Sequence, residues 1–136
     1  MVIMLIADES TEVRQALTRV LTRVGHHIVT TGDHFAALQL VRSTRPGLVI
    51  LDACSPALRS VDLCRAIRGD PGSATAAIIL TSACAVPSEI EAGLAAGADE
   101  FLFKPFRTDD VLSHAHALLS RPRPAPADPQ GAWPRG

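Results

Sequence analysis

The sequence predicts an α/β fold: a doubly wound, five-stranded parallel sheet of order 2-1-3-4-5 with helices on both faces. Short apolar runs alternate along the chain with segments in which apolar residues recur at helical spacing. The central run, 48–51, is apolar without interruption, as in a strand that is buried on both faces of a sheet. Parallel strands joined by helices have right-handed crossovers, so the two patterns together indicate the topology.

The individual elements follow from this alternation. Strands are expected at 2–7, 27–30, 47–52, 76–81 and 100–103, and helices at 11–24, 35–45, 61–67, 88–96 and 108–120. The second strand is more polar than the others, which is typical of the edge of a sheet. We expect the helices to be capped by Ser10, Ser88 and Thr108 and ended by Gly25 and Gly97.

The composition changes after Ser120, which places the domain at residues 1–120. Residues 121–136 are rich in Pro, Gly and Ala and nearly free of large apolar side chains. Such a composition predicts a disordered tail or a truncated linker. Trp133 lies in this segment and is expected to be exposed to solvent.

Length and composition exclude several classes of protein. A chain of 136 residues with 47% hydrophobic residues suits one globular domain, and a net charge of −1 gives no reason to expect a nucleic-acid or membrane partner. No apolar run approaches the roughly 20 residues of a membrane span, and the N-terminus lacks the features of a signal peptide. Three cysteines are too few for a disulfide framework. We therefore expect a cytoplasmic protein with reduced thiols.

Polar residues of complementary chemistry end four of the expected strands, namely Asp8 and Glu9, Asp52, Thr81 and Ser82, and Lys104. In a parallel sheet these ends lie at one edge, where ligands bind. Three neighbouring carboxylates require a compensating cation, and Mg²⁺ prefers oxygen ligands. A hydroxyl and an ammonium group suit phosphoryl oxygens, so Asp52 is the candidate acceptor of a phosphoryl group.

Each of these residues alone has an ordinary explanation. An acid after a strand can cap the next helix, a serine can be a loop hydroxyl, and a lysine can be a surface charge. It is their joint position at the ends of the expected central strands that indicates a site.

Over residues 1 to about 120, the chain resembles the receiver domain of two-component response regulators. The resemblance implies a flavodoxin-like fold. The motifs that carry the resemblance are Ala7-Asp8-Glu9-Ser10, Leu51-Asp52 with Pro56, Leu80-Thr81-Ser82-Ala83, Gly97-Ala98-Asp99-Glu100-Phe101 and Lys104-Pro105-Phe106. Asp52 follows Glu9 by 43 residues and precedes Ser82 by 30. Lys104 follows Ser82 by 22 residues, and these spacings match the family with Ser82, not Thr81, as the functional hydroxyl.

The resemblance implies a set of roles. Asp52 would accept a phosphoryl group from a histidine kinase or a phosphotransfer protein. Mg²⁺ would be held by Asp8, Glu9, Asp52 and the backbone carbonyl of Cys54. Ser82 and Lys104 would bind the phosphoryl oxygens, with the Lys104–Pro105 peptide bond often cis.

The output side of the site is also implied by the resemblance. Phe101 would be the aromatic switch residue of a face made by the fourth helix, the fifth strand and the fifth helix. That face would control a downstream protein or an output domain absent from this chain.

Three positions depart from the family pattern. Ser60 replaces a usual glycine, Phe101 lacks the hydroxyl of the commoner tyrosine, and His114 stands where winged-helix regulators often carry an arginine for dimerisation. The conformation of the loop before Ser60 and dimerisation of that type are therefore open.

The two cysteines near the site leave one further alternative open. Cys54 lies two residues after Asp52, and Cys84 lies two residues after Ser82, so by the resemblance both flank the phosphoryl group. Against the expectation of ordinary reduced thiols stands the alternative that the two form a disulfide under oxidation.

Three rival functions remain to be weighed against a signalling domain that is not a metabolic enzyme. An interaction module that is never phosphorylated would not need the acidic pair, Asp52, Ser82 and Lys104. An aspartyl phosphatase usually has a second aspartate two residues after its nucleophile, where this chain has Cys54. A flavodoxin-type cofactor binder needs a hydroxyl- and Gly-rich phosphate loop, which Asp8 and Glu9 do not provide.

Overall fold

A computed structural model of the protein describes residues 2–83 and 86–121. The strands are β1 (Ile3–Ala7), β2 (His27–Thr31), β3 (Leu48–Asp52), β4 (Ala77–Ser82) and β5 (Glu100–Phe103). The helices are α1 (Thr11–Arg23), α2 (His34–Thr44), α3 (Ser60–Gly69), α4 (Pro87–Ala95) and α5 (Thr108–Ser120). Most of the segment 121–136, Trp133 and Cys84 lie outside the described residues, so the predicted tail stays a prediction.

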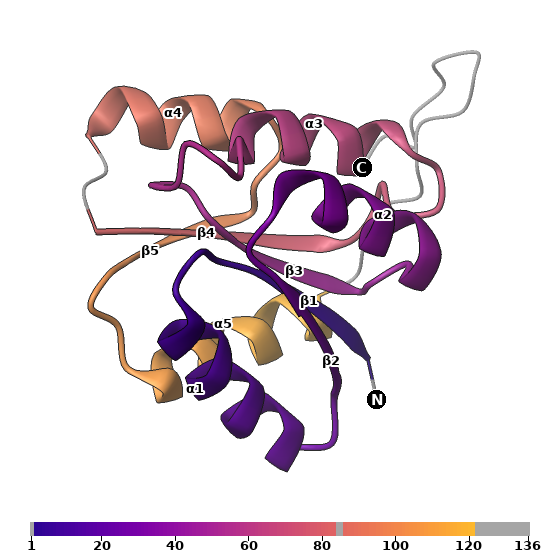
Figure 1. The fold of residues 1–136 in the computed structure, drawn as a ribbon, viewed down its shortest axis with the longest axis vertical. Helices are drawn as coiled ribbons and strands as arrows, with labels where there is room; N and C mark the ends of the chain where they lie inside the picture. Colours follow the sequence, from indigo (N-terminus) through magenta and orange to yellow (C-terminus); the bar gives the residue numbers. More distant parts are fainter. Residues whose placement is uncertain (1, 84–85, 122–136) are drawn as a thin grey trace.

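The five described strands form one parallel sheet in the order β2-β1-β3-β4-β5, which confirms the predicted fold class. The strand β2 lies at an edge, as its polar sequence predicted, and all five residues of β3 are buried. Helices α2, α3 and α4 cover one face of the sheet, and α1 and α5 cover the other (Figure 1). No helix in the described ranges combines the length and hydrophobicity that crossing a bilayer requires.

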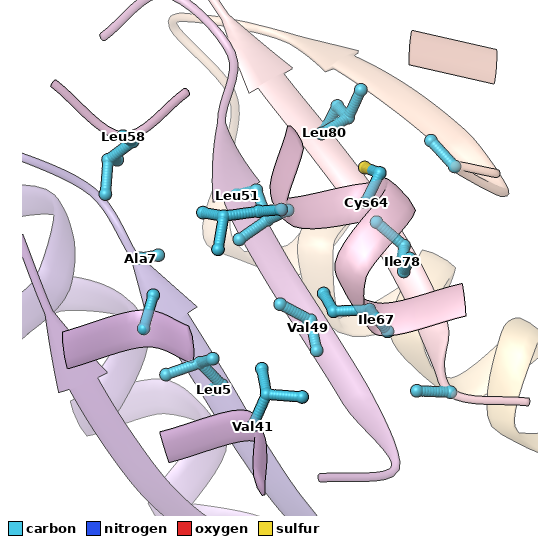
Figure 2. Close-up of a cluster of buried hydrophobic side chains, with 14 of the residues drawn as sticks. Leu5, Ala7, Val41, Val49, Leu51, Leu58, Cys64, Ile67, Ile78 and Leu80 are labelled. Atoms are coloured by element: carbon cyan, nitrogen blue, oxygen red, sulfur yellow. The ribbon is translucent and has the colours of Figure 1, made fainter. Parts of the chain in front are cut away.

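Each face of the sheet has its own hydrophobic core, because successive side chains of a strand point to opposite faces. Val49 and Leu51 of β3 pack with Ile67 of α3 in the core under α2 and α3 (Figure 2). Leu48 and Ile50 belong to the core on the side of α1 and α5. Burial on both faces holds the central strands in register. Because these strands are parallel, their carboxyl ends lie at one edge of the sheet.

The helix starts differ in part from those predicted. Ser10 caps α1 as expected, accepting a hydrogen bond from the backbone N–H of Val13 at 3.2 Å. The predictions for Ser88 and Thr108 are wrong, because both lie inside their helices and the residues before these helices make no side-chain cap bond. Proline suits the first turn of a helix, so α4 begins at Pro87, ahead of Ser88.

Hydrogen bonds of Arg68 and Asp99 hold the turn between α4 and β5 against the amino-terminal end of β4. The Arg68 guanidinium donates to the Gly97 carbonyl at 2.7 Å and to Asp99 Oδ2 at 3.1 Å. The same Asp99 oxygen accepts from the backbone N–H of Ile78 at 2.8 Å. Gly97 has a φ of +116°, and a Cβ there would lie 2.6 Å from Arg68 Cγ.

We expect Gly97→Ala to lower the free energy of unfolding by about 1–3 kcal/mol, because an alanine at this φ is strained and meets the arginine side chain. Gly69→Ala is the matched control, because no atom lies within 4 Å of a Cβ added there. The control should be unchanged or gain about 0.4–1 kcal/mol. Urea unfolding of both variants measures the difference, and equal stabilities would contradict the analysis.

Candidate functional site

Backbone pairing brings three of the predicted site residues onto neighbouring strands. Asp52, the last residue of β3, pairs with Thr81 of β4, and Ser82 follows directly. The backbone N–H of Lys104 donates to the Ser82 carbonyl at 2.8 Å, which extends the pairing of β4 with β5 by one residue. Backbone hydrogen bonds between neighbouring strands therefore connect the residues that carry the candidate acceptor, the hydroxyl and the ammonium group.

The ammonium group of Lys104 lies between two buried carboxylates. Its Nζ is 2.8 Å from Asp8 Oδ2 and 3.5 Å from Asp52 Oδ2. The side chains of Asp8 and Asp52 are only 4% and 9% exposed. At such burial an unpaired carboxylate is costly, so Lys104 compensates charges that are poorly accessible to water.

The environment of Asp52 raises the pKa of its carboxyl above the ordinary aspartate value. Burial is the largest cause, and the charge of Asp8 adds to it. A hydrogen bond from the backbone N–H of Cys54 to Asp52 Oδ1, 3.0 Å long, and the Lys104 ammonium oppose the rise. The carboxylate is thus held where its negative charge is poorly solvated, and binding of a compensating group would be favourable.

The loop between β1 and α1 is held by its own hydrogen bonds and by Arg14. Asp8 Oδ1 accepts from the backbone N–H of Ser10 at 2.8 Å. The Arg14 guanidinium donates to the carbonyls of Asp8 and Glu9. Sequence reasoning missed Arg14, although its place on the first turns of a helix beside two acidic residues was visible.

The loop between β3 and α3 is fastened to α2 by a buried histidine. His34 is 6% exposed, and its Nδ1 lies 2.7 Å from the Leu58 carbonyl oxygen. Arg59 at the end of the loop has a φ of +49°, directly before Ser60, where the family usually has glycine. Arg59, with its left-handed backbone conformation, therefore lies directly before Ser60, the position at which the sequence departs from the family. Neither His34 nor Arg59 was predicted as part of the site.

The predicted group of three carboxylates is corrected to two. Asp8 and Asp52 share Lys104, whereas Glu9 is exposed. Within 2–83 and 86–121, no three His, Cys, Asp or Glu side chains are grouped so that they could hold a metal ion together. Mg²⁺ binds through one or two carboxylates and keeps several waters. The two carboxylates that share Lys104, Asp8 and Asp52, fit that chemistry.

Thr81 and Ser82 end β4, and Phe101 lies on the neighbouring strand β5. Ser82 is fully buried at the end of β4, and the Thr81 hydroxyl lies 3.5 Å from the Leu51 carbonyl. The half-buried Phe101 ring lies 5.6 Å from the ring of Phe103, which is 57% exposed. These positions leave an aromatic pair on β5 beside α4.

The Lys104–Pro105 peptide bond is cis, as expected. His114, at the place of the family's arginine, has its Nδ1 2.5 Å from Glu100 Oε2 of β5. The side chain is thus engaged within the chain, on the face formed by β5 and α5.

The described cysteines differ in state. Cys64 is free and fully buried, and burial raises the pKa of its thiol to about 11. Cys54 is partly exposed and disulfide-bonded. The expectation of reduced thiols is therefore confirmed for Cys64 and wrong for Cys54.

Comparison with known proteins agrees with this geometry. The family described as the response regulator receiver domain matches residues 4–116. The response regulator MprA of Mycobacterium tuberculosis is 37% identical over 90% of this chain and 53% of its own length. The DNA-binding response regulator MtrA of Mycobacterium leprae is 33% identical over 91% of this chain and 54% of its own. The chain thus spans about half the length of these relatives.

A solved structure of similar fold is the putative response regulator from Chloroflexus aurantiacus. It superposes with a TM-score of 0.80 at 28% identity, over 88% of this chain and 98% of that one. The likeness therefore extends over nearly all of the described residues.

In the metal-free protein, Asp52→Asn is expected to raise the free energy of unfolding at neutral pH, because the amide removes a charge that burial disfavours. The folded state holds the pKa of Asp52 above its unfolded value, so stability falls as pH rises between these two values. The advantage of the variant should therefore shrink on acidification below the ordinary aspartate pKa.

Denaturation in EDTA over a pH series measures this effect. Asp62→Asn is the control, because Asp62 is an exposed partner of Arg59 and such pairs contribute little. A gain at neutral pH that does not shrink in acid, or no gain at all, would contradict the electrostatic analysis.

Proposed function

The chain belongs to the family of response regulator receiver domains, and from this premise we propose that it accepts a phosphoryl group on Asp52 in a Mg²⁺-dependent reaction. The donor is the phosphohistidine of a histidine kinase or a phosphotransfer protein. The observation that carries the proposal is the buried Asp52 carboxylate, which has Lys104 at 3.5 Å and the fully buried Ser82 at the end of the adjacent strand.

The transfer exchanges one bond to phosphorus for another. An Asp52 Oδ attacks the phosphorus and forms an acyl phosphate, while the bond from phosphorus to the imidazole nitrogen breaks. That nitrogen keeps the electron pair, and the imidazole leaves as the neutral ring because its other nitrogen carries a proton. Lys104 then binds a phosphoryl oxygen and Ser82 donates its hydroxyl, because both groups lie at the strand ends beside Asp52.

Asp8, Asp52 and the Cys54 carbonyl would hold the Mg²⁺, with Glu9 acting through a water molecule. When bound, the cation neutralises charge on the phosphoryl oxygens. The same cation would replace Lys104 as the compensating charge of Asp8. Lys104 would then be available to the phosphoryl group.

The output of the proposed switch is the face formed by α4, β5 and α5. Phe101 would change its position when Ser82 engages the phosphoryl group. Leu94 and Phe103 are 45% and 57% exposed on α4 and β5, so the face has apolar surface for a partner. The partner is a downstream protein or an output domain, since relatives are about twice as long.

The rival functions are less consistent with the site. An aspartyl phosphatase would need an acid/base two residues after Asp52, and the disulfide-bonded Cys54 has no proton to transfer. A module that is never phosphorylated would not require two buried carboxylates around a lysine. We therefore propose a phosphoacceptor and not a metabolic enzyme. The cytoplasmic location stays a prediction.

The first test is phosphorylation itself. With Mg²⁺ and a small phosphodonor such as acetyl phosphate, intact-mass spectrometry should show one added phosphoryl group. Asp52→Asn should abolish the addition, whereas Asp62→Asn, on the exposed side of α3, should retain it. Phosphorylation that persists in Asp52→Asn would refute the acceptor.

The second test concerns the metal. Mg²⁺ should raise the Tm of the parent, because it binds the folded site and not the unfolded chain; at about 100 times its Kd the gain is about 2.7 kcal/mol. Asp8→Ala should remove most of this increase. Asp109→Ala, which changes a highly exposed acid on α5, should leave the increase intact. If Asp8→Ala responds to Mg²⁺ like the parent, the assignment of the metal ligand is wrong.

A further inference from the structure

The main chain of Asp8 is fixed by two neighbouring segments. Its N–H donates to the carbonyl of Thr31, the last residue of β2, at 3.0 Å. Its carbonyl oxygen accepts from the Arg14 guanidinium on α1. Because the peptide groups on both sides of the Asp8 Cα are restrained, the direction in which its side chain leaves the backbone is fixed as well.

The guanidinium of Arg14 bonds three groups of the loop that precedes it. Nη1 donates to the carbonyls of Asp8 and Glu9, the latter at 3.1 Å, and Nη2 donates to the Thr11 hydroxyl at 3.0 Å. A planar fork of donors suits several acceptors at fixed positions, whereas a lysine ammonium is a compact point charge. The residues held in this way include both acids of the proposed Mg²⁺ site.

Gly32, which lies between β2 and α2, leaves room for this guanidinium. A Cβ at position 32 would lie 2.9 Å from Arg14 Nη1 and 3.4 Å from the Asp8 carbonyl oxygen. The φ of Gly32 is outside the left-handed region, so it does not by itself require a glycine. The missing side chain therefore matters for the position of Arg14 and not for the turn.

We propose that Arg14 and Gly32 act as one unit that positions Asp8 for Mg²⁺ and thereby raises the affinity of the site for the cation. The inference rests on the proposed function and adds two positioning residues that act through the backbone of Asp8 and Glu9. Groups that orient a metal ligand change metal affinity by about 10–100-fold when they are removed.

The charge of Arg14 alone would have the opposite effect. A guanidinium close to a cation site repels the cation, so the loss of this charge by itself would strengthen Mg²⁺ binding. Positioning and charge therefore predict changes of opposite sign when Arg14 is replaced by a neutral residue. Gly32→Ala keeps the charge and crowds the place of Nη1, so it tests positioning separately.

The experiment is a Mg²⁺ titration of the full chain, followed by amide NMR spectra that report both the Kd and the integrity of the fold. We expect Arg14→Met, Arg14→Lys and Gly32→Ala each to raise the Kd of Mg²⁺ about tenfold. The rate of phosphorylation by acetyl phosphate at saturating Mg²⁺ should stay close to that of the parent. Arg19→Lys, on the exposed side of α1, and Gly69→Ala, where a Cβ meets no atom within 4 Å, should bind Mg²⁺ like the parent.

The double variant tests whether the two residues act as a unit. If Gly32→Ala acts by displacing the guanidinium, it should have no further effect on the Kd in the Arg14→Met background. Effects of the two substitutions that multiply in the double variant would show independent actions and would overturn the inference.

The other outcomes are also decisive. An unchanged Kd in Arg14→Lys and Gly32→Ala, tighter binding in Arg14→Met, or a phosphorylation rate at saturating Mg²⁺ that falls as much as the affinity would each overturn the inference. If the parent binds Mg²⁺ but is not phosphorylated on Asp52, the proposed acceptor fails, whereas the Kd values still decide the role of Arg14. If the parent does not bind Mg²⁺, the proposed metal site fails and the inference fails with it.

Discussion

The ion pairs of Lys104 with Asp8 and Asp52 are the interaction on which the site depends. They place one ammonium group against two carboxylates that are nearly inaccessible to water. Burial raises the pKa of the Asp52 carboxyl above its ordinary value, and the nearby ammonium group of Lys104 opposes that rise. The backbone bond from Lys104 to Ser82 positions this ammonium group, so the end of the β4–β5 pairing affects the electrostatics of Asp52.

The loops that follow Asp8 and Asp52 are held by side chains that are not among the candidate site residues. Arg14 donates to the backbone carbonyls of Asp8 and Glu9, and the buried His34 lies against the Leu58 carbonyl. Both contacts are made to the backbone, so they restrain the path of a loop and leave its side chains available. Under the proposed function, a site arranged in this way would take up a cation and a phosphoryl group without rebuilding its loops.

The sequence was sufficient to predict the sheet and the position of the main candidate residues at its edge, because both follow from the same pattern. An uninterrupted apolar run can only be buried on both faces, and a polar residue at its end must then lie at the edge of the sheet. The contact of His34 with Leu58 joins segments that are 24 residues apart in the chain, and no local pattern reveals it. The exposure of Glu9 and the disulfide of Cys54 likewise depend on how loops turn after the strands end.

A crystal structure with Mg²⁺ and beryllium trifluoride, an analogue of the phosphoryl group, would test the exchange at Lys104 most directly. The account predicts the analogue on an Asp52 oxygen, the cation on Asp8, and Lys104 Nζ moved from Asp8 to a fluorine atom near Ser82. An analogue bound at another residue, or a lysine that still pairs with Asp8 while the cation and the analogue are bound, would contradict it.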